Sequence, residues 1–181
     1  MTENTNQKSA FIAIVGRPNV GKSSMLNRLI GQKVAIVSKK PQTTRTRIMG
    51  VLTEELVQLV FIDTPGLIKP KNPLGEYMVK AINQSISGVD ACALVVEADT
   101  KISNADLELI KKFKAMKMPT ILVINKIDLV SDKSKLISQI VKLNEMYSFE
   151  AVVPISAMDG NGIPQLKDEL KKLTFESQHI F

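Results

Sequence analysis

Eight consecutive residues near the N-terminus have the types and spacing needed to hold phosphate groups. The run GRPNVGKS at 16–23 matches G-x-x-x-x-G-K-[ST] and lies between an apolar run and a helical pattern. Its glycines let backbone N–H groups face phosphate oxygens at a helix N-terminus, where the helix dipole favours anions. Lys22 is expected to reach the β and γ phosphates, and Ser23 to bind magnesium. We expect the nucleotide to contact Arg17, Pro18, Asn19, Val20, Gly21, Lys22, Ser23 and Ser24.

A second short motif adds a carboxylate. DTPGL at 63–67 directly follows the apolar run VQLVFI. We expect Asp63 to bind magnesium through a water molecule, and the N–H of Gly66 to meet the γ-phosphate. Asp and Gly are also common turn residues, so this motif gains its meaning from the phosphate loop upstream. Leu67, which comes next, can neither take a proton nor orient a water molecule.

Two further motifs predict a base site. NKID at 125–128 directly follows the apolar run TILVI. The carboxylate of Asp128 can accept two N–H bonds from guanine, whereas adenine presents an acceptor there. Lys126 can lay its stem along the purine, and Asn125 can tie this loop to the phosphate loop. Ser156 and Ala157 follow a later run, and the Ala157 N–H is expected to face guanine O6.

These motifs need a scaffold that brings them to one edge. Apolar runs of strand length alternate with helical patterns, which indicates a doubly wound α/β fold with helices on both faces of a mostly parallel sheet. The runs IMGVLT and VQLVFI are separated by a very short link, so one strand pair is an antiparallel hairpin and the sheet has six strands. The runs lie at 11–15, 48–53, 57–62, 91–96, 120–124 and 151–155, and the helical patterns at 22–31, 74–86, 103–116, 132–146 and 162–173.

Composition indicates a single soluble domain. The chain has 181 residues, of which 44% are hydrophobic and 23% charged, and its apolar runs are too short to cross a bilayer. The polar start, about residues 1–9, shows no targeting signal, and one cysteine is typical of a cytoplasmic protein. The formal net charge of +6 favours polyanionic partners, although small enzymes can be this basic without one, and basic residues are concentrated at 39–47. Glu97 directly follows the run at 91–96, and its side chain faces either solvent or the switch segments.

The order GRPNVGKS, QTTR, DTPG, NKID and SA resembles the translation-factor-class GTPases, and among them the Era type of the TrmE-Era-EngA-like group. The resemblance covers about residues 10–175. It implies the P-loop NTPase fold, GTP and GDP as ligands, Mg²⁺, slow GTP hydrolysis and a role in assembly of the small ribosomal subunit. It also makes Thr44 the expected magnesium ligand of the GTP state, with Thr43 as the alternative. The segments 38–47 and 64–76 would then be switches ordered by the γ-phosphate.

The resemblance also implies a domain that does not follow here. Era proteins continue into a KH domain that clamps single-stranded RNA, whereas this chain stops at Phe181. We therefore expect one GTPase domain over 1–181, either an excised domain or a naturally short protein. Its expected partners are a guanine nucleotide and, by family, the small ribosomal subunit and its RNA. Peripheral membrane contact stays open, and we expect a monomer or a weak nucleotide-dependent dimer.

Leu67 leaves the attacking water without a side chain to orient it. In Era relatives with an asparagine at the position of Asn19, that side chain helps to bind a potassium ion beside the phosphates. Asn19 fits this pattern, although asparagine also suits a tight turn. The expected catalytic set is therefore Lys22, Thr44, Gly66 and Asn19, with K⁺ as a further cofactor. An alternative is a nucleotide-binding interaction module with negligible turnover, whereas an ATPase or small-molecule kinase is disfavoured by NKID.

Overall fold

One mixed sheet forms the centre of the molecule. The computed structural model describes residues 6–31, 47–63 and 88–179. The sheet order is β2-β3-β1-β4-β5-β6, and β7 pairs with β1. The strands are β1 Lys8–Val15, β2 Arg47–Glu54, β3 Val57–Asp63, β4 Ala91–Glu97, β5 Thr120–Asn125, β6 Ala151–Pro154 and β7 Phe175–Glu176. The helices are α1 Lys22–Ile30, α3 Asn104–Met116, α4 Lys133–Met146 and α5 Ile163–Lys171, with the 3-10 helix η1 at Ile127–Leu129.

The inner strands are buried on both faces. All six residues of β5 are buried, as are the first six of the seven in β4. A strand covered on both sides needs continuous apolar residues rather than an alternating pattern, which explains the runs ACALVV and TILVI. Both strands lie parallel to their sheet neighbours. The α/β fold class with a mostly parallel sheet is therefore confirmed.

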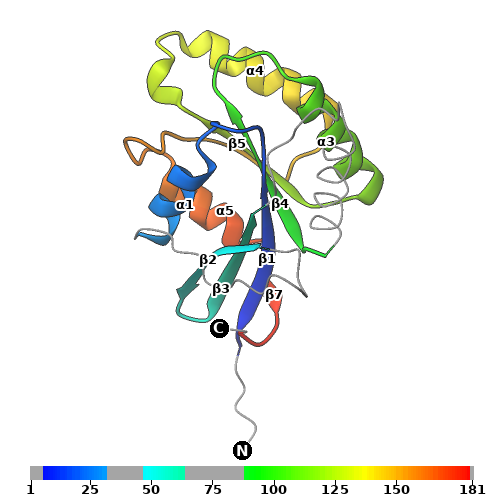
Figure 1. Cartoon of the computed structure of the whole chain (residues 1–181), viewed down its shortest axis with the longest axis vertical. Coiled ribbons are helices and arrows are strands. Elements are labelled where there is room, and N and C mark those ends of the chain that lie inside the picture. The colour runs from blue at the N-terminus through cyan, green and yellow to red at the C-terminus, as the bar shows by residue number, and fades with distance from the viewer. Residues whose placement is uncertain (1–5, 32–46, 64–87, 180–181) are drawn as a thin grey trace, which may run out of the picture.

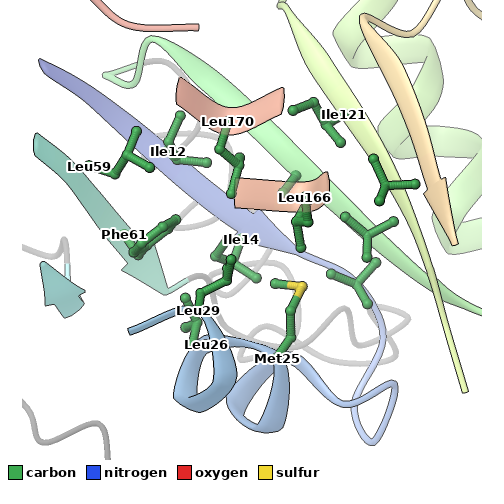
Figure 2. Packing of buried hydrophobic residues seen from close by; sticks show 14 of the residues in the cluster. Ile12, Ile14, Met25, Leu26, Leu29, Leu59, Phe61, Ile121, Leu166 and Leu170 are labelled. Carbon is green, nitrogen blue, oxygen red and sulfur yellow. The ribbon is translucent and has the colours of Figure 1, made fainter. Parts of the chain in front are cut away.

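Helices cover the sheet from both sides. Figure 1 shows α1 and α5 on one side and α3 and α4 on the other. The core under α1 and α5 includes the side chains drawn in Figure 2, where Leu166 and Leu170 of α5 lie over β1 and Met25 projects from α1. Each leucine side chain buried in this way stabilises the fold by about 1.5–3 kcal/mol. The second core joins α3 and α4 to the opposite face of the sheet.

The observed elements differ from the predicted ones mainly at the sheet margins. The two-residue strand β7 was not predicted, and its antiparallel pairing with β1 gives the sheet a seventh strand. β1 begins at Lys8, inside the predicted polar tail, because its first residues pair with both β3 and β7. The predicted hairpin is present as β2 and β3, with Glu55 at positive φ in the turn. The predicted helix at 74–86 lies outside the described residues.

No helix in the described ranges is both long enough and apolar enough to span a bilayer.

Candidate functional site

The carboxyl ends of five parallel strands meet at one edge of the sheet. β1, β3, β4, β5 and β6 all run in the same direction. The strand register places Ile14 opposite Asp63 and Glu97 opposite Asn125. The order of strands reverses at β1, which lies between β3 and β4. In open α/β sheets, ligands bind in the crevice at such a point, outside the carboxyl ends of the strands.

The loop from β1 to α1 requires glycine at both glycine positions of the G-x-x-x-x-G-K-[ST] motif. Gly16 and Gly21 have φ of +151° and +98°, which other residues rarely adopt. A Cβ at Gly16 would lie 2.6 Å from the carbonyl oxygen of Val95, and one at Gly21 would lie 2.2 Å from Nδ2 of Asn125. These distances are too short for any real contact. The loop therefore lies directly against the ends of β4 and β5.

Among the described residues, no side chain caps the N-terminus of α1. Its N-cap residue, Gly21, makes no side-chain cap, and its first turn contains no acidic residue. By contrast, α3 and α4 are capped by Ser103 and Asp132, whose side chains accept backbone N–H bonds. The first N–H groups of a helix have no partner within the helix, so those of α1 can bind a ligand. The glycine curl and this helix end together fit a phosphate group.

A cation and two hydroxyl side chains accompany this helix end. Nζ of Lys22 donates a 2.8 Å hydrogen bond to the carbonyl oxygen of Gly16, so the ammonium group connects the end of the loop to its start. Ser23 and Ser24 are exposed in the first turn of α1. Asp63 is the last residue of β3, beside the end of β1. Thr44 and Gly66, predicted to complete the magnesium and γ-phosphate contacts, lie outside the described residues.

Asn125 joins the phosphate loop to the loop after β6. Its side chain is buried, and its Nδ2 donates a 2.9 Å hydrogen bond to the carbonyl oxygen of Val20. Its Oδ1 accepts a 3.0 Å hydrogen bond from the N–H of Ala157. That N–H was predicted to serve guanine O6, so in this structure it already has a partner inside the protein. A base oxygen at this place would share the Ala157 N–H with Asn125.

Lys126 makes a second link to the phosphate loop. Its Nζ donates a 2.8 Å hydrogen bond to the carbonyl oxygen of Asn19 and lies 2.7 Å from Oε1 of Glu97. Both Lys126 and Asn19 have φ of 68°, an uncommon conformation for residues other than glycine. The side chain of Lys126 therefore connects two loops. The sequence predicts that one of them holds the base and the other the phosphates.

Asp128 is oriented by Ser156. The buried hydroxyl group of Ser156 donates a 2.9 Å hydrogen bond to Oδ1 of Asp128 and accepts a 3.1 Å bond from the N–H of Asp159. Asp128 itself is exposed at the start of η1. The sequence placed Ser156 in the base site only through its neighbour Ala157. Its hydroxyl contact was not predicted, because the two residues are far apart in the chain.

Two arginines make further contacts that the sequence did not reveal. Arg28 of α1 donates from Nε to the carbonyl oxygen of Ala157 at 2.8 Å and from Nη2 to that of Met158. Arg17 pairs with Asp106 of α3, with Nε and Oδ2 3.5 Å apart. Burial raises the pKa of the Asp106 carboxyl above its ordinary value, and the Ser103 hydrogen bond and Arg17 partly offset this. Both loops are thus fastened to neighbouring helices.

Three features define a P-loop nucleotide-binding domain: the two glycines of the β1–α1 loop, the N-terminus of α1, and the group Asn125-Lys126-Asp128. Residues 11–126 match the family described as "50S ribosome-binding GTPase". GTPase Era of Ruminiclostridium cellulolyticum is 47% identical over 174 residues, which are 96% of this chain and 58% of that protein. The chain belongs to this GTPase family and is of the Era type.

Solved structures agree with this assignment. A variant of Aquifex aeolicus Era bound to GDP and AlF4⁻ has a TM-score of 0.82 and 36% identity, covering 97% of this chain and 60% of that one. Era in complex with MgGDPNP and nucleotides 1506–1542 of 16S ribosomal RNA has a TM-score of 0.79 and 37% identity, with the same coverage. The chain thus spans about three fifths of the length of these Era proteins.

Proposed function

We propose that the chain binds guanine nucleotides and hydrolyses GTP to GDP and phosphate. One observation carries this proposal. Asn125 and Lys126 donate hydrogen bonds to the carbonyl oxygens of Val20 and Asn19, so the base loop and the phosphate loop form one assembly. A single nucleotide can therefore contact both loops at once.

Asp128 selects the base in this proposal. The Ser156 hydroxyl group donates to one of its carboxylate oxygens, which restrains the orientation of the group. The carboxylate can then accept two N–H bonds from guanine. Adenine would leave it facing an acceptor, and an unpaired charge at a binding site is costly. We therefore expect GTP and GDP to bind and ATP to be rejected.

The phosphates and the metal occupy the other half of the site. Lys22 and the first N–H groups of α1 face the phosphates, and the Gly66 N–H meets the γ-phosphate. Ser23 and Thr44 bind magnesium directly, and Asp63 binds it through water. Bound Mg²⁺ neutralises charge that develops on the β and γ oxygens. The segments 38–47 and 64–76 are then ordered in the GTP state and released after hydrolysis, which is the output of the switch.

The side chain of Leu67 cannot orient the attacking water molecule. In the proposed mechanism, a potassium ion instead supplies positive charge beside the phosphates. Asn19 would supply its side-chain oxygen as a ligand. Its φ of 68° gives asparagine a second reason to occupy this position, because asparagine tolerates the left-handed region better than most residues. An alanine replacement would add backbone strain to the loss of the ligand. Asn19→Gly permits the same backbone conformation and removes the side-chain ligand.

Single-turnover release of phosphate from GTP tests turnover and the ion together. We expect slow release that is faster in potassium than in sodium, and Asn19→Gly should abolish the difference while retaining GDP binding. Equal rates in the two salts would contradict the role of potassium. GDP binding without any phosphate release would favour the alternative, an interaction module with negligible turnover. Leu67 motivates this alternative, because a leucine side chain cannot orient the attacking water molecule.

We further propose that the domain acts in assembly of the small ribosomal subunit. The support is the Era type of the chain and the 16S ribosomal RNA in the Era complex. The family description names the large subunit instead. Binding of an RNA that contains nucleotides 1506–1542, measured against salt concentration, tests this proposal. Binding that is absent even at low salt would contradict an RNA contact by this chain.

A further inference from the structure

Glu97 lies in a fixed position at the edge of the nucleotide site. It is the last residue of β4, which lies beside β5 (Figure 1), and the register pairs it with Asn125. Its carbonyl oxygen accepts hydrogen bonds from Oγ1 of Thr100 at 2.8 Å and from Nε2 of Gln139 at 2.9 Å. The backbone of Glu97 is thus held by its strand, by the following turn and by α4.

The side chain of Glu97 reaches the Lys126 ammonium group. The two charged atoms are 2.7 Å apart, and the side chains are only 29% and 34% exposed. The same ammonium group donates to the carbonyl oxygen of Asn19, 2.8 Å away. Lys126 is therefore held between a carboxylate on one side and the phosphate loop on the other.

A nearby ion pair shows how an ordinary surface contact differs. Lys135 and Asp99 are 3.9 Å apart and are 59% and 46% exposed. Such a pair is loose and contributes little. In the Glu97 pair, the lysine backbone is also fixed in the left-handed region. A residue kept in an uncommon backbone conformation at a site is often there for function.

We propose that Glu97 is a positioning residue for guanine-nucleotide binding. Its carboxylate fixes Lys126, so that the aliphatic stem is already placed along the base and the ammonium group remains on the phosphate loop. Without the Glu97 carboxylate, the Lys126 side chain would be more mobile in the free protein. Binding of the nucleotide would then cost more conformational entropy, which lowers the affinity. This inference rests on the proposed function. It predicts equal effects on GDP and GTP, because the base is common to both.

The test is the affinity of Glu97→Gln for GDP and GTP. We expect both dissociation constants to rise about three- to tenfold, as for the loss of a partly buried ion pair, with faster release. The melting temperature without nucleotide should change little. Asp99→Asn is the matched control: it removes the same charge two residues further along the chain, at a residue outside the site, and should leave both constants unchanged.

Two further variants show whether Glu97 acts through Lys126. In a Lys126→Met background, which keeps the stem but not the charge, Glu97→Gln should cause no further loss. Glu97→Asp, which keeps the charge on a shorter side chain, should lose less affinity than Glu97→Gln. An undiminished loss in the Lys126→Met background, or a larger loss with Asp than with Gln, would overturn the inference.

The wild-type protein separates the two possible failures. If it binds GDP and Glu97→Gln binds equally well, the positioning role is wrong and the proposed function stands. If the wild-type protein binds no guanine nucleotide, the proposed function is wrong and the inference is overturned with it.

Discussion

The carboxylate of Asp128 is held on one side only. Ser156 bonds to Oδ1 at 2.9 Å, and the residue is otherwise exposed. A carboxylate in this state offers acceptors alone, which suits the two N–H groups on the edge of guanine. In the proposed function, the choice of base at this site therefore depends on the hydrogen-bonding pattern of a single side chain.

Asp128→Asn should reverse the preference for the base. The amide presents one donor in place of an acceptor, so guanine loses a charge-assisted bond while xanthine, with a carbonyl oxygen at C2, gains a partner. GDP affinity should fall about 10- to 100-fold and xanthosine diphosphate affinity should rise. Competition between the two nucleotides measures this. Asp132→Asn, which removes a nearby charge but retains a capping side chain, serves as control; a loss of GDP affinity there would contradict the assignment.

The sequence indicates candidate residues of the site, but it does not indicate the contacts between them. Lys22, Asn125 and Asp128 stand in short motifs whose chemistry can be read locally. The contacts of Glu97 with Lys126, and of Arg28 with Ala157, depend on strand register and helix packing. Such contacts join residues far apart in the chain, and one sequence has no pattern that pairs them.

At the scale of elements, prediction succeeded where the pattern was strong. The long apolar runs form strands, and the described α-helices begin and end within two residues of the predicted ones, whereas the 3-10 helix η1 was not predicted. β7 was missed because a two-residue strand with both residues exposed has no periodicity to detect. The start of β1 was missed because Lys8 and Ser9 are polar, and their strand conformation comes from pairing with β3 and β7.

Glu54 links β2 to α5 through two lysines and makes a pH-dependent contribution to the free energy of unfolding. Its carboxylate oxygens lie 2.9 Å from Nζ of Lys167 and 2.5 Å from Nζ of Lys171. The hydrogen bonds from Lys171 and Lys167 hold the pKa of the Glu54 carboxyl below its ordinary value of 4.5. Because the folded state favours the charged form, the contribution is complete above the unfolded pKa. It is lost as the pH falls through the lower folded pKa.

Glu54→Gln should therefore destabilise the fold more at neutral pH than in acid. Since the side chain is 36% exposed, we expect a loss of under about 1 kcal/mol at pH 7 that diminishes at an acidic pH below the ordinary pKa of 4.5. Urea unfolding at both pH values measures the difference. Glu145→Gln, at an exposed position of α4, is the control for removal of a carboxylate. A loss of equal size at both pH values would show that the link is not electrostatic.

At the scale of the whole molecule, the only cysteine reports on opening of the sheet. Cys92 is fully buried in β4 and is paired in register with Ala13 of β1 and Thr120 of β5. Burial raises the pKa of its thiol to about 12, which suppresses the reactive thiolate. A reagent can reach this thiol only when neighbouring strands separate. That event also dismantles the edge of the sheet where the nucleotide site lies.

Labelling of Cys92 should therefore be slow, and slower still with bound nucleotide. A ligand at 100 times its dissociation constant stabilises the folded state by about 2.7 kcal/mol, so GDP at that level should slow labelling about 100-fold where opening is in rapid equilibrium. Thiol labelling with and without GDP measures this, and ADP at the same concentration is the control. Labelling as fast as in the denatured chain would contradict the central position of Cys92.

The most direct test of the central claim is displacement of a fluorescent GDP from the wild-type chain, with magnesium present, by unlabelled GDP and ADP. Asn125 and Lys126 donate hydrogen bonds to the phosphate loop, and Asp128 follows them in the same loop. We therefore expect that GDP displaces the probe and that ADP, even at 100-fold excess over GDP, does not. Equal displacement by ADP would contradict the selection of guanine by Asp128. Failure of the fluorescent GDP to bind would contradict the nucleotide site itself.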